Sequence, residues 1–383
     1  MRVLLLINAF ERDAPSRMMA QVAFGAREAG HDIMVGALMR PGPLEDDLRQ
    51  RGIPTALLNM TGRAVWHSTS QLKNLIADFR PDIFQTTLIR PTLVGVPVAR
   101  KCGLDRIVIT QNGVHEWQEC GTLVNLFVPR LFRAAAGRAS AIVAVSDATR
   151  ADLASAGIDS AKLQTIHNGI ETELFPTRTC NDSLAKSRQQ LRTELFGEKE
   201  ADSLLIVGAV GNLRPVKGHR TLVQAAALAR KKRNELRFVI WGEGPERRSL
   251  ESLVNREGLG GVCQLPGGTT NIPAALAACD LFVQPSHQEA FGLAAVEAMC
   301  CGLPVLATRV GGLQEIVEEN VTGLLISPDN PTEFARAVLE LAGDKPRRIE
   351  MGERGRQRVM EKFTASRMVN DYVKLYETLM DRN

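Results

Sequence analysis

The sequence predicts two α/β domains in series, each built around a doubly wound parallel sheet. Three observations predict this fold class. The chain has 383 residues, which is too long for one ordinary hydrophobic core. Short β-rich runs alternate with helical patterns in both halves, which indicates parallel βαβ units. A polar, charged stretch over residues 176–202 separates the halves and is typical of a linker.

The first half supplies five predicted strands. Its opening run, RVLLLIN, is continuously apolar, as buried parallel strands are. The stretch over residues 16–30 has helical spacing and ends at Gly30, and the next run, HDIMVGAL, is a strand again. We therefore expect strands at residues 2–8, 31–38, 81–88, 106–112 and 141–147.

The second half repeats this alternation with six predicted strands, at residues 203–213, 236–244, 261–267, 280–286, 303–312 and 323–328. A surface helix is expected near residues 183–196. The final stretch, residues 364–380, is amphipathic and begins at Thr364, a residue type favoured at the N-cap of a helix.

Composition excludes several classes of protein. Aromatic residues make up only 5% of the chain, which argues against a stacking platform for nucleic acid, and the net charge is only +4. The seven cysteines show no C-x-x-C spacing, which indicates a reduced cytosolic protein without a disulfide framework or zinc site. The apolar run at residues 3–7 is too short for a signal peptide, and no stretch approaches membrane-spanning length. We expect a cytoplasmic protein that at most lies on a membrane.

Doubly wound sheets bind ligands at the carboxyl ends of their strands, so we weighed the segments that follow predicted strands. The first is GNLRPVKGH, residues 211–219, in which two glycines permit close backbone approach and Arg214 and Lys217 supply positive charge. A strand, a Gly-rich basic loop and a helix form a phosphate-binding arrangement. A solvated surface loop is an equally good interpretation of this segment taken alone.

Weaker signals follow other strands. Gly242-x-Gly244 resembles part of a dinucleotide fingerprint, but Arg247 stands where the third glycine belongs, so a tight turn is the better interpretation. His115 follows a first-domain strand, where a lone histidine is more often structural than functional. Ser146 is a predicted helix cap, and Asn168-Gly169 is a predicted turn.

The stretch SHQEAFGLAAVEAMCCG, residues 286–302, places two carboxylates in an apolar setting. Gly292 is a predicted break and LAAVEAMCC a helix stopped by Gly302, so Glu289 precedes the helix N-terminus and Glu297 lies within the helix. Buried carboxylates are costly unless hydrogen-bonded, and a hydroxyl-rich ligand supplies such bonds. The alternative is that Glu289 only caps the helix and Glu297 pairs with a basic residue.

In order and rough spacing, these segments resemble glycosyltransferase family 4. The resemblance rests on VSDATRADL, HNGIETELF, GNLRPVKGH, GEGPERRSLESL, PSHQEAFGLAAVEAMCCGLPVLAT and GGLQEIV, and its most specific part is the E-x7-E pair. It implies a retaining, nucleotide-sugar-dependent enzyme with the GT-B fold, in which two Rossmann-like domains face a central cleft. It also implies an acceptor-side domain at residues 1–175, a linker at 176–202 and a nucleotide-sugar domain at 203–363. The helix at 364–383 would pack back on the first domain.

The resemblance also implies roles for individual residues. Glu289 would lie against the donor sugar and Glu297 would bind the ribose hydroxyls, while Lys217 would neutralise the departing diphosphate. We expect Glu289, Lys217 and His115 in catalysis. The residues expected to bind the donor are Asn212, Arg214, Lys217, Gly242, Glu243, Phe291, Gly292, Leu293 and Glu297.

The chain departs from the family pattern at two places. Asn212 stands where the family usually has an arginine that shares the diphosphate with the lysine, so Arg214 is the candidate substitute. Ala14-Pro15 stands where the loop after the first strand commonly carries a Gly-Gly pair. Arg12 and Arg17 are the residues that would compensate there.

The resemblance predicts transfer of a hexose to a glycan or lipid-linked acceptor, in bacterial cell-surface polysaccharide or lipopolysaccharide synthesis. Two alternatives are kept: a catalytically weak nucleotide-sugar-binding protein, and a nucleotide-sugar epimerase on the same fold. No D-x-D motif lies in a suitable loop, so we expect neither an essential metal nor a cofactor, and we expect no nucleic-acid partner. Residues expected on the acceptor side are Arg63, Trp66, His67 and Arg90.

The stretch LVNLFVPRLFRAAAGRA, residues 123–139, combines apolar bulk with three arginines. Such a helix can rest on an anionic membrane, as a peripheral contact at the inner face of the cell membrane. A core-packing helix with a solvated basic edge is the favoured alternative.

Overall fold

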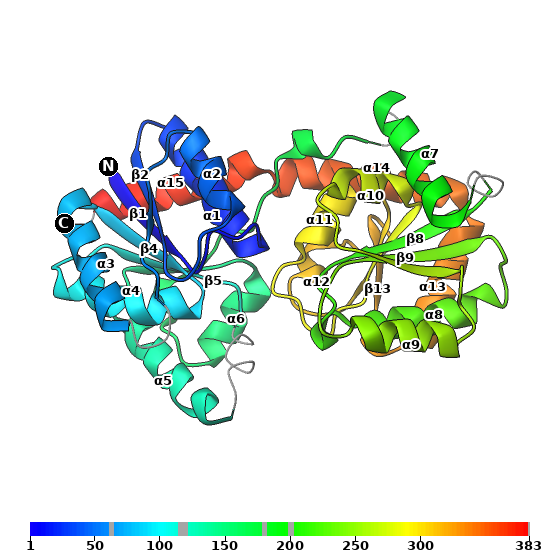
Figure 1. Ribbon diagram of the computed structural model, residues 1–383, viewed down its shortest axis with the longest axis horizontal. Coiled ribbons are helices and arrows are strands. Elements are labelled where there is room, and N and C mark those ends of the chain that lie inside the picture. Colours follow the sequence, from blue (N-terminus) through cyan, green and yellow to red (C-terminus); the bar gives the residue numbers. More distant parts are fainter. Residues whose placement is uncertain (61–64, 114–121, 178–181, 198–202, 382–383) are drawn as a thin grey trace. The chain divides into compact units, whose positions relative to one another are not determined.

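The computed structural model describes residues 1–60, 65–113, 122–177, 182–197 and 203–381, and it divides into two compact α/β units (Figure 1). The first unit comprises Met1–Gly169 with Ala365–Asn383, and the second comprises Ile170–Thr364. The predicted fold class is confirmed. The division falls at Gly169, so residues 170–175 and the helix within the expected linker belong to the second unit.

The first unit contains, in its described residues, a seven-stranded parallel sheet with the order β3-β2-β1-β4-β5-β6-β7. Its strands are β1 (Arg2–Ile7), β2 (Asp32–Ala37), β3 (Thr55–Leu57), β4 (Ile83–Thr87), β5 (Ile107–Gln111), β6 (Ala141–Ala144) and β7 (Leu163–Thr165). Its helices are α1 (Ala14–Glu28), α2 (Pro43–Gln50), α3 (Val65–Phe79), α4 (Ile89–Lys101), α5 (Thr122–Gly137), α6 (Asp147–Ser155), the short η3 (Ser160–Lys162) and α15 (Ala365–Asp381). The predicted strands are present, and β3 and β7 are two short edge strands that the sequence pattern did not reveal.

The second unit contains, over the part of the chain that is described, a six-stranded parallel sheet with the order β10-β9-β8-β11-β12-β13. Its strands are β8 (Leu205–Val210), β9 (Leu236–Trp241), β10 (Cys263–Gly267), β11 (Leu281–Gln284), β12 (Val305–Thr308) and β13 (Gly323–Ile326). Its helices are η4 (Thr172–Leu174), α7 (Asp182–Phe196), η5 (Pro215–Lys217), α8 (His219–Arg230), α9 (Arg247–Arg256), α10 (Ile272–Ala278), α11 (Leu293–Cys300), α12 (Leu313–Ile316), α13 (Pro331–Gly343) and α14 (Lys345–Lys362).

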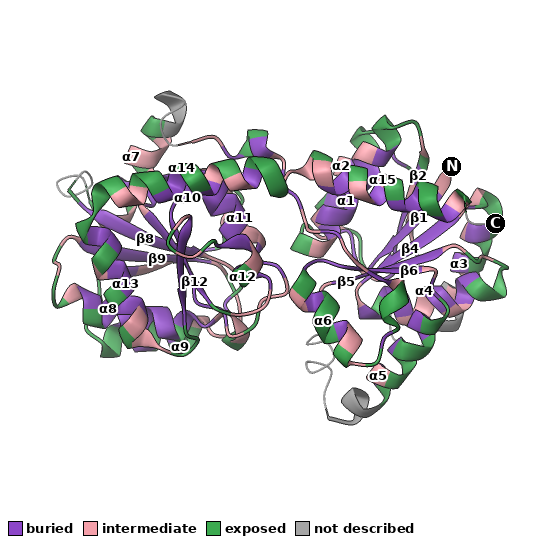
Figure 2. Ribbon diagram, turned by 180° about the vertical axis from the view of Figure 1, so that it is seen from behind, coloured by how far each residue is buried: buried purple, intermediate pink, exposed green. Residues whose placement is uncertain are grey.

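Each sheet is the buried centre of its unit, with helices on both faces (Figure 2). In the first unit Leu4 and Phe84 are fully buried, and in the second Val207, Phe238 and Phe282 are. Strands covered on both faces need apolar residues at successive positions, which explains the continuous runs in the sequence.

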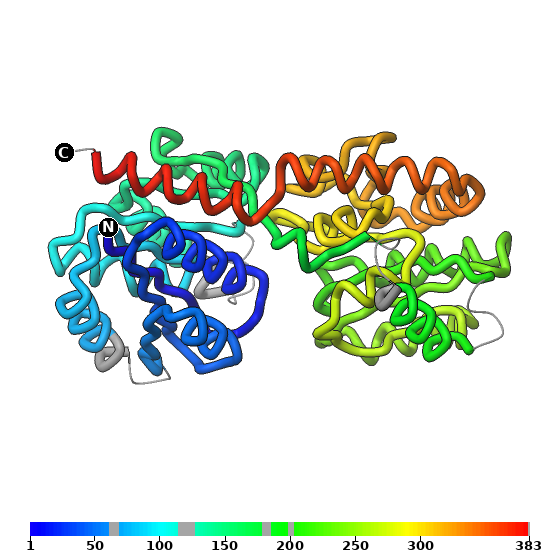
Figure 3. The backbone as a smooth tube through the Cα atoms, turned by 90° about the horizontal axis from the view of Figure 1, so that it is seen from above, coloured from blue at the N-terminus to red at the C-terminus, as the bar shows by residue number. Residues whose placement is uncertain are grey.

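The C-terminal helix α15 belongs to the first unit and runs along α1 (Figure 3). It carries the only two tyrosines of the chain, Tyr372 and Tyr376, and both are buried. The hydroxyl of Tyr372 lies 3.1 Å from that of Thr110 on β5, and Tyr376 donates a hydrogen bond to Gln85 on β4. These contacts tie α15 to the sheet, because buried hydroxyls need partners.

None of the helices in the described residues is long and apolar enough to cross a lipid bilayer.

Candidate functional site

The candidate site lies where strand order reverses in the second sheet. Strands β8, β9 and β10 follow one another toward one edge, and β11, β12 and β13 follow toward the other, so β8 and β11 are neighbours. In doubly wound sheets this switch point opens a crevice at the carboxyl ends of the two strands. The loop after β8 carries Lys217 and the loop after β11 carries Glu289, so both expected catalytic groups of this unit meet at one edge.

Lys217 and Glu289 form an ion pair across this edge. The Nζ of Lys217 lies 2.6 Å from Oε2 of Glu289, and the two side chains are 27% and 12% exposed. The backbone N–H of His287 donates to the carbonyl of Val216 at 2.8 Å and fixes the two loops to each other. The pair is therefore accessible to a ligand while its two loops are held together.

The carboxylate of Glu289 has two further donors. Nε2 of Gln284 lies 2.7 Å and Oγ of Ser286 lies 3.1 Å from the same oxygen, Oε2. The hydroxyl of Thr308 on β12 donates to the carbonyl of Ser286 at 2.5 Å, and the N–H of Gly312 donates to the carbonyl of Glu289 at 3.0 Å. A carboxylate held by three donors keeps one orientation, which a group positioned against a sugar requires.

Helix α11 begins three residues after Ala290, and Glu297 lies within it with only 4% of its surface exposed. Gly292 precedes the helix with φ of +115°, a backbone conformation that L side chains rarely adopt. Phe291 is buried, and its ring meets the edge of Phe363 at a centroid distance of 5.8 Å. The predicted break and helix are confirmed, and they leave the first N–H groups of α11 beside the Glu289 loop.

The loops after β8, β9 and β10 are packed on one another through glycine. A Cβ at Gly242 would lie 1.9 Å from the carbonyl oxygen of Gly211, so only glycine permits this approach. Gly242 donates to the carbonyl of Gly267 at 2.8 Å. Glu243 is exposed, and its hydrogen bond to Arg247 lowers the pKa of its carboxyl group. The N–H groups of Gly211 and Leu213 donate to the carbonyls of Trp241 and Glu243 at 3.0 and 2.9 Å, which holds the loop that carries Asn212 against this turn.

Asn212 and Arg214 are both exposed on that loop, and the N–H of Arg214 donates to the carbonyl of Asn212 at 2.9 Å. His219 begins the following helix, α8, and is 2% exposed. Burial lowers the pKa of its imidazole to about 4, and the nearby charge of Lys217 acts in the same direction. A neutral ring therefore lies beside the cationic group of the site at neutral pH.

The first unit gives a less complete picture of the expected acceptor side. Arg90 is exposed and is the second residue of α4, and the helix follows Leu88, whose φ of +69° is unusual for a leucine. Trp66 and His67 lie in the first turn of α3, and their side chains are outside the description. His115 and Arg63 lie outside the described residues.

The loop after β1 carries Arg12, whose charge is paired within the first unit. Arg12 makes two hydrogen bonds to the carboxylate of Asp47 on α2, at 2.7 and 2.9 Å, and these raise the pKa of its guanidinium. Arg12, expected to compensate for the missing Gly-Gly pair, is thus engaged by another part of its own unit.

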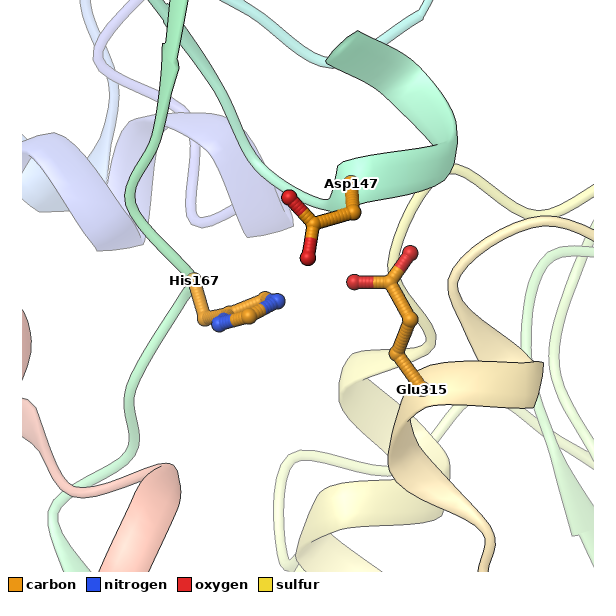
Figure 4. A group of neighbouring side chains, drawn as sticks. All are labelled: Asp147, His167 and Glu315. Carbon is orange, nitrogen blue, oxygen red and sulfur yellow. The ribbon is translucent and has the colours of Figure 1, made fainter. Parts of the chain in front are cut away.

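Two family motifs of the first unit meet at Asp147 and His167, whose ligand atoms lie within 4.8 Å of each other (Figure 4). The predicted cap is confirmed, because Ser146 accepts a hydrogen bond from the N–H of Thr149. Arg367 on α15 donates to the carbonyl of His167 at 3.2 Å. Figure 4 also draws Glu315, which belongs to α12 of the second unit.

The sequence did not single out Gln284, Ser286, Thr308 and His219. Gln284 and Ser286 are polar residues at the end of a predicted strand, which was a usable signal. Thr308 gave none, because its contact with Ser286 depends on which strands are neighbours, and His219 entered the sequence analysis only as the last residue of GNLRPVKGH.

Two family models match this chain. The model described as Glycosyl transferases group 1 matches residues 192–358, and the one described as Glycosyltransferase Family 4 matches residues 16–174.

Two curated relatives illustrate the range of similarity. N-acetyl-alpha-D-glucosaminyl L-malate synthase of Bacillus anthracis is 30% identical over 223 residues, 58% of this chain and 55% of the relative. A GDP-mannose-dependent alpha-(1-6)-phosphatidylinositol monomannoside mannosyltransferase of Mycobacterium tuberculosis is 29% identical over 296 residues, 75% and 73% of the two chains. The chain spans about half the length of the first curated relatives that it matches, at 55%, 46% and 51%.

Solved structures show the same fold over the whole chain. Alr3699/HepE of Anabaena, solved in complex with UDP-glucose, has a TM-score of 0.86 at 22% identity and covers 99% of this chain and 100% of its own. WaaG, a glycosyltransferase involved in lipopolysaccharide biosynthesis, has a TM-score of 0.74 at 18% identity, covering 98% and 99%. The predicted GT-B fold is confirmed. With both family models matched, the chain belongs to glycosyltransferase family 4.

Proposed function

We propose that this protein is a retaining glycosyltransferase that transfers a hexose from a nucleotide-sugar to a glycan or lipid-linked acceptor. The observation that carries the proposal is the Lys217–Glu289 pair, 2.6 Å apart at the β8/β11 edge. An ammonium group suits a diphosphate, and a fixed carboxylate suits sugar hydroxyls. Membership of glycosyltransferase family 4 supports the reaction class.

In this reaction the acceptor oxygen bonds to the anomeric carbon, and the bond from that carbon to the β-phosphate oxygen breaks. The nucleoside diphosphate leaves with additional negative charge, and retention means that the new bond lies on the same face of the sugar as the old one. Catalysis rests on positioning and on stabilising that departing charge.

We assign Lys217 to the departing diphosphate and Glu289 to the donor sugar near the reacting carbon. A diphosphate that draws the ammonium group of Lys217 away leaves Glu289 with its donors Gln284 and Ser286, so the carboxylate stays oriented. The N-terminus of α11, beside Gly292 and Leu293, suits the phosphate charge. Arg214 is assigned as the second cation, because Asn212 has no charge. Glu297 on the same helix is assigned to the ribose.

The acceptor is assigned to the first unit, with Arg90, Arg63, Trp66, His67 and His115 as candidates. The names of the relatives include an N-acetyl-alpha-D-glucosaminyl L-malate synthase and a phosphatidylinositol monomannoside mannosyltransferase, so hydroxyl acceptors of both small-molecule and lipid type are worth testing. Cell-surface polysaccharide or lipopolysaccharide synthesis is the proposed setting, supported by the fold likeness to WaaG.

A thermal-shift screen against UDP-, GDP-, ADP- and CMP-sugars tests donor binding first. A ligand at 100 times its Kd stabilises by about 2.7 kcal/mol, which raises the Tm of units of this size by about 5–10 °C. The matching sugar should then release nucleoside diphosphate slowly without acceptor and faster with one. NMR of the product should show the anomeric configuration of the donor.

Each alternative has its own outcome. Interconversion of the donor sugar without transfer would identify an epimerase, and binding without turnover for every acceptor would identify a binding protein. An inverted product, or no stabilisation by any nucleotide-sugar, would overturn the proposal.

A further inference from the structure

The two oxygens of the Glu289 carboxylate have different surroundings. Oε2 lies 2.6 Å from Nζ of Lys217, 2.7 Å from Nε2 of Gln284 and 3.1 Å from Oγ of Ser286. Oε1 accepts no hydrogen bond from the residues that the structure describes. Because the side chain is 12% exposed, Oε1 is the oxygen that remains for a ligand.

Of the two uncharged donors to Oε2, Gln284 holds the carboxylate more tightly. A hydroxyl group that donates to a carboxylate does so at about 2.5–2.7 Å, so the 3.1 Å contact of Ser286 is a weak one. The 2.7 Å contact of Gln284 is at the short end of the range for an N–H donor. The orientation of Glu289 therefore depends more on Gln284 than on Ser286.

Gln284 is itself held in one orientation. It is the last residue of β11, where its backbone is paired with Ala307 of β12, and it is 6% exposed. Its amide cannot turn over, because Oε1 of Gln284 would then meet the carboxylate oxygen of Glu289. In the observed orientation this Oε1 is buried and has no hydrogen-bond partner among the described residues. A buried oxygen without a partner lowers stability, and natural proteins tolerate such costs chiefly at functional sites.

We propose that Gln284 is a positioning residue for the transfer reaction, which holds Oε2 of Glu289 so that Oε1 of Glu289 faces a hydroxyl group of the donor sugar. This inference rests on the proposed function and deepens it, because it gives separate tasks to the two carboxylate oxygens. Gln284 acts through Glu289, since its Nε2 is bonded to the carboxylate and its Oε1 is buried. When the ammonium group of Lys217 moves to the diphosphate, Gln284 keeps the carboxylate from turning.

Steady-state kinetics of Gln284→Met with the donor found in the screen tests the proposal. Methionine has a similar length and volume but donates no hydrogen bond. The kcat should fall about 10- to 100-fold, because a small displacement of a group at the reacting centre is enough for such a loss, and KM for the donor should stay within about threefold. Gln284→Asn, whose amide is one methylene group shorter, should lose kcat to a similar extent.

A double variant tests whether Gln284 acts through Glu289. The kcat of Gln284→Met/Glu289→Gln should equal that of Glu289→Gln within about twofold, because the carboxylate that Gln284 positions is already absent. A further loss by the full factor seen for Gln284→Met alone would show that Gln284 acts independently of Glu289, and would overturn the inference.

The matched control is Gln85→Met in the first unit, the same substitution at another buried strand glutamine. Gln85 donates to the hydroxyl of Thr110 at 3.0 Å and accepts from that of Tyr376, so its loss leaves a buried tyrosine hydroxyl without its acceptor. The Tm of the control should fall by at least about 4 °C, with kcat within about twofold of the wild type. The Tm of Gln284→Met should stay within about 2 °C, because the substitution removes an unpartnered buried oxygen together with the hydrogen bond.

The outcomes separate this inference from the proposed function. A fall in Tm of Gln284→Met as large as that of the control would assign Gln284 a structural role, and an unchanged kcat would remove it from the reaction. Either result, in a wild type that transfers sugar, would overturn this inference alone. A wild type that turns over no nucleotide-sugar would overturn the proposed function and this inference together.

Discussion

The loop after the first strand of each sheet occupies an equivalent place in the two units, but the two loops direct their positive charge differently. The order β3-β2-β1-β4-β5-β6 in the first sheet corresponds to β10-β9-β8-β11-β12-β13 in the second. After β8, Lys217 pairs with Glu289 from the neighbouring strand β11, and both side chains are largely covered. After β1, Arg12 pairs with Asp47 of α2, and both side chains are open to solvent, at 55% and 34% exposed.

The difference shows that strand order alone does not place a cation and a carboxylate opposite each other at a switch point. Both sheets have a switch point, at β1/β4 and at β8/β11, yet only the second has a cation and a carboxylate facing each other across it, within the described residues. A partly buried pair held by further hydrogen bonds is preorganised for a ligand, whereas an exposed pair contributes little in either stability or chemistry. Substitutions in the two loops should therefore have very different effects.

Replacing Lys217 with alanine should have the largest effect. Loss of one preorganised group that stabilises developing charge costs about 3 kcal/mol, so kcat should fall about 100- to 1,000-fold. Steady-state kinetics with the donor found in the screen measures it. Circular dichroism melting should show a folded variant, because Glu289 keeps Gln284 and Ser286 as hydrogen-bond donors. A folded Lys217→Ala variant with near-normal kcat would remove Lys217 from catalysis.

The buried imidazole beside Lys217 should make the stability of the second unit depend on pH. The folded pKa of His219 is about 4 and its unfolded value is 6.5, so the unfolded chain binds the proton first as pH falls. The contribution of His219 to the free energy of unfolding should be fully present above pH 6.5. It should be lost toward pH 4, by about 3 kcal/mol in total for 2.5 pKa units.

Urea unfolding of the wild type and of His219→Asn at pH 7.5 and pH 4.5 isolates this effect. The wild type should lose more stability than the variant between the two pH values, because carboxylates titrate in both. An equal loss of unfolding free energy in the two proteins would show that the pKa of His219 is the same in the folded and unfolded states.

Replacing Arg12 with alanine should have the smallest effect. Exposed ion pairs contribute about 0–1 kcal/mol, so unfolding free energy should change by no more than about 0.5 kcal/mol and kcat by less than about twofold. The same unfolding and kinetic assays apply. A kcat loss comparable to that of Lys217→Ala would mean that the first-unit loop also contacts the substrate.

The long, continuously apolar strands and the amphipathic helices were predictable, because burial on both sides of a sheet leaves a strong pattern in sequence. The strands β3 and β7 were not, since three-residue strands at a sheet edge with at most one buried residue give too little pattern. Residues 170–175 group with the second unit, where the thiol of Cys300 lies beside the carbonyls of Thr172 and Phe175, and the domain bounds expected from the sequence stay a prediction.

The sequence predicted Lys217 and Glu289 as separate site residues, but it did not predict that they form an ion pair. Glu289 and Lys217 are 72 positions apart, and their contact follows from the adjacency of β8 and β11, which local sequence patterns do not encode. For the same reason, the sequence did not reveal that the hydroxyl of Thr308 donates a hydrogen bond to the carbonyl of Ser286. For Gly242, the sequence indicated a tight turn, and the structure adds the close approach to Gly211 that excludes a side chain.

The most direct test of the donor site in the second unit is isothermal titration of the wild type, Glu297→Gln and Glu289→Gln with UDP and GDP. Glu297→Gln should weaken nucleotide binding by about 1.5–3 kcal/mol, because charge-assisted hydrogen bonds to ribose hydroxyls are lost. Glu289→Gln should leave nucleotide affinity nearly unchanged and depress turnover with the full donor, since we assign Glu289 to the donor sugar and not to the nucleotide. Equal losses of nucleotide affinity in the two variants, or no loss in Glu297→Gln, would contradict the division of roles between the two carboxylates.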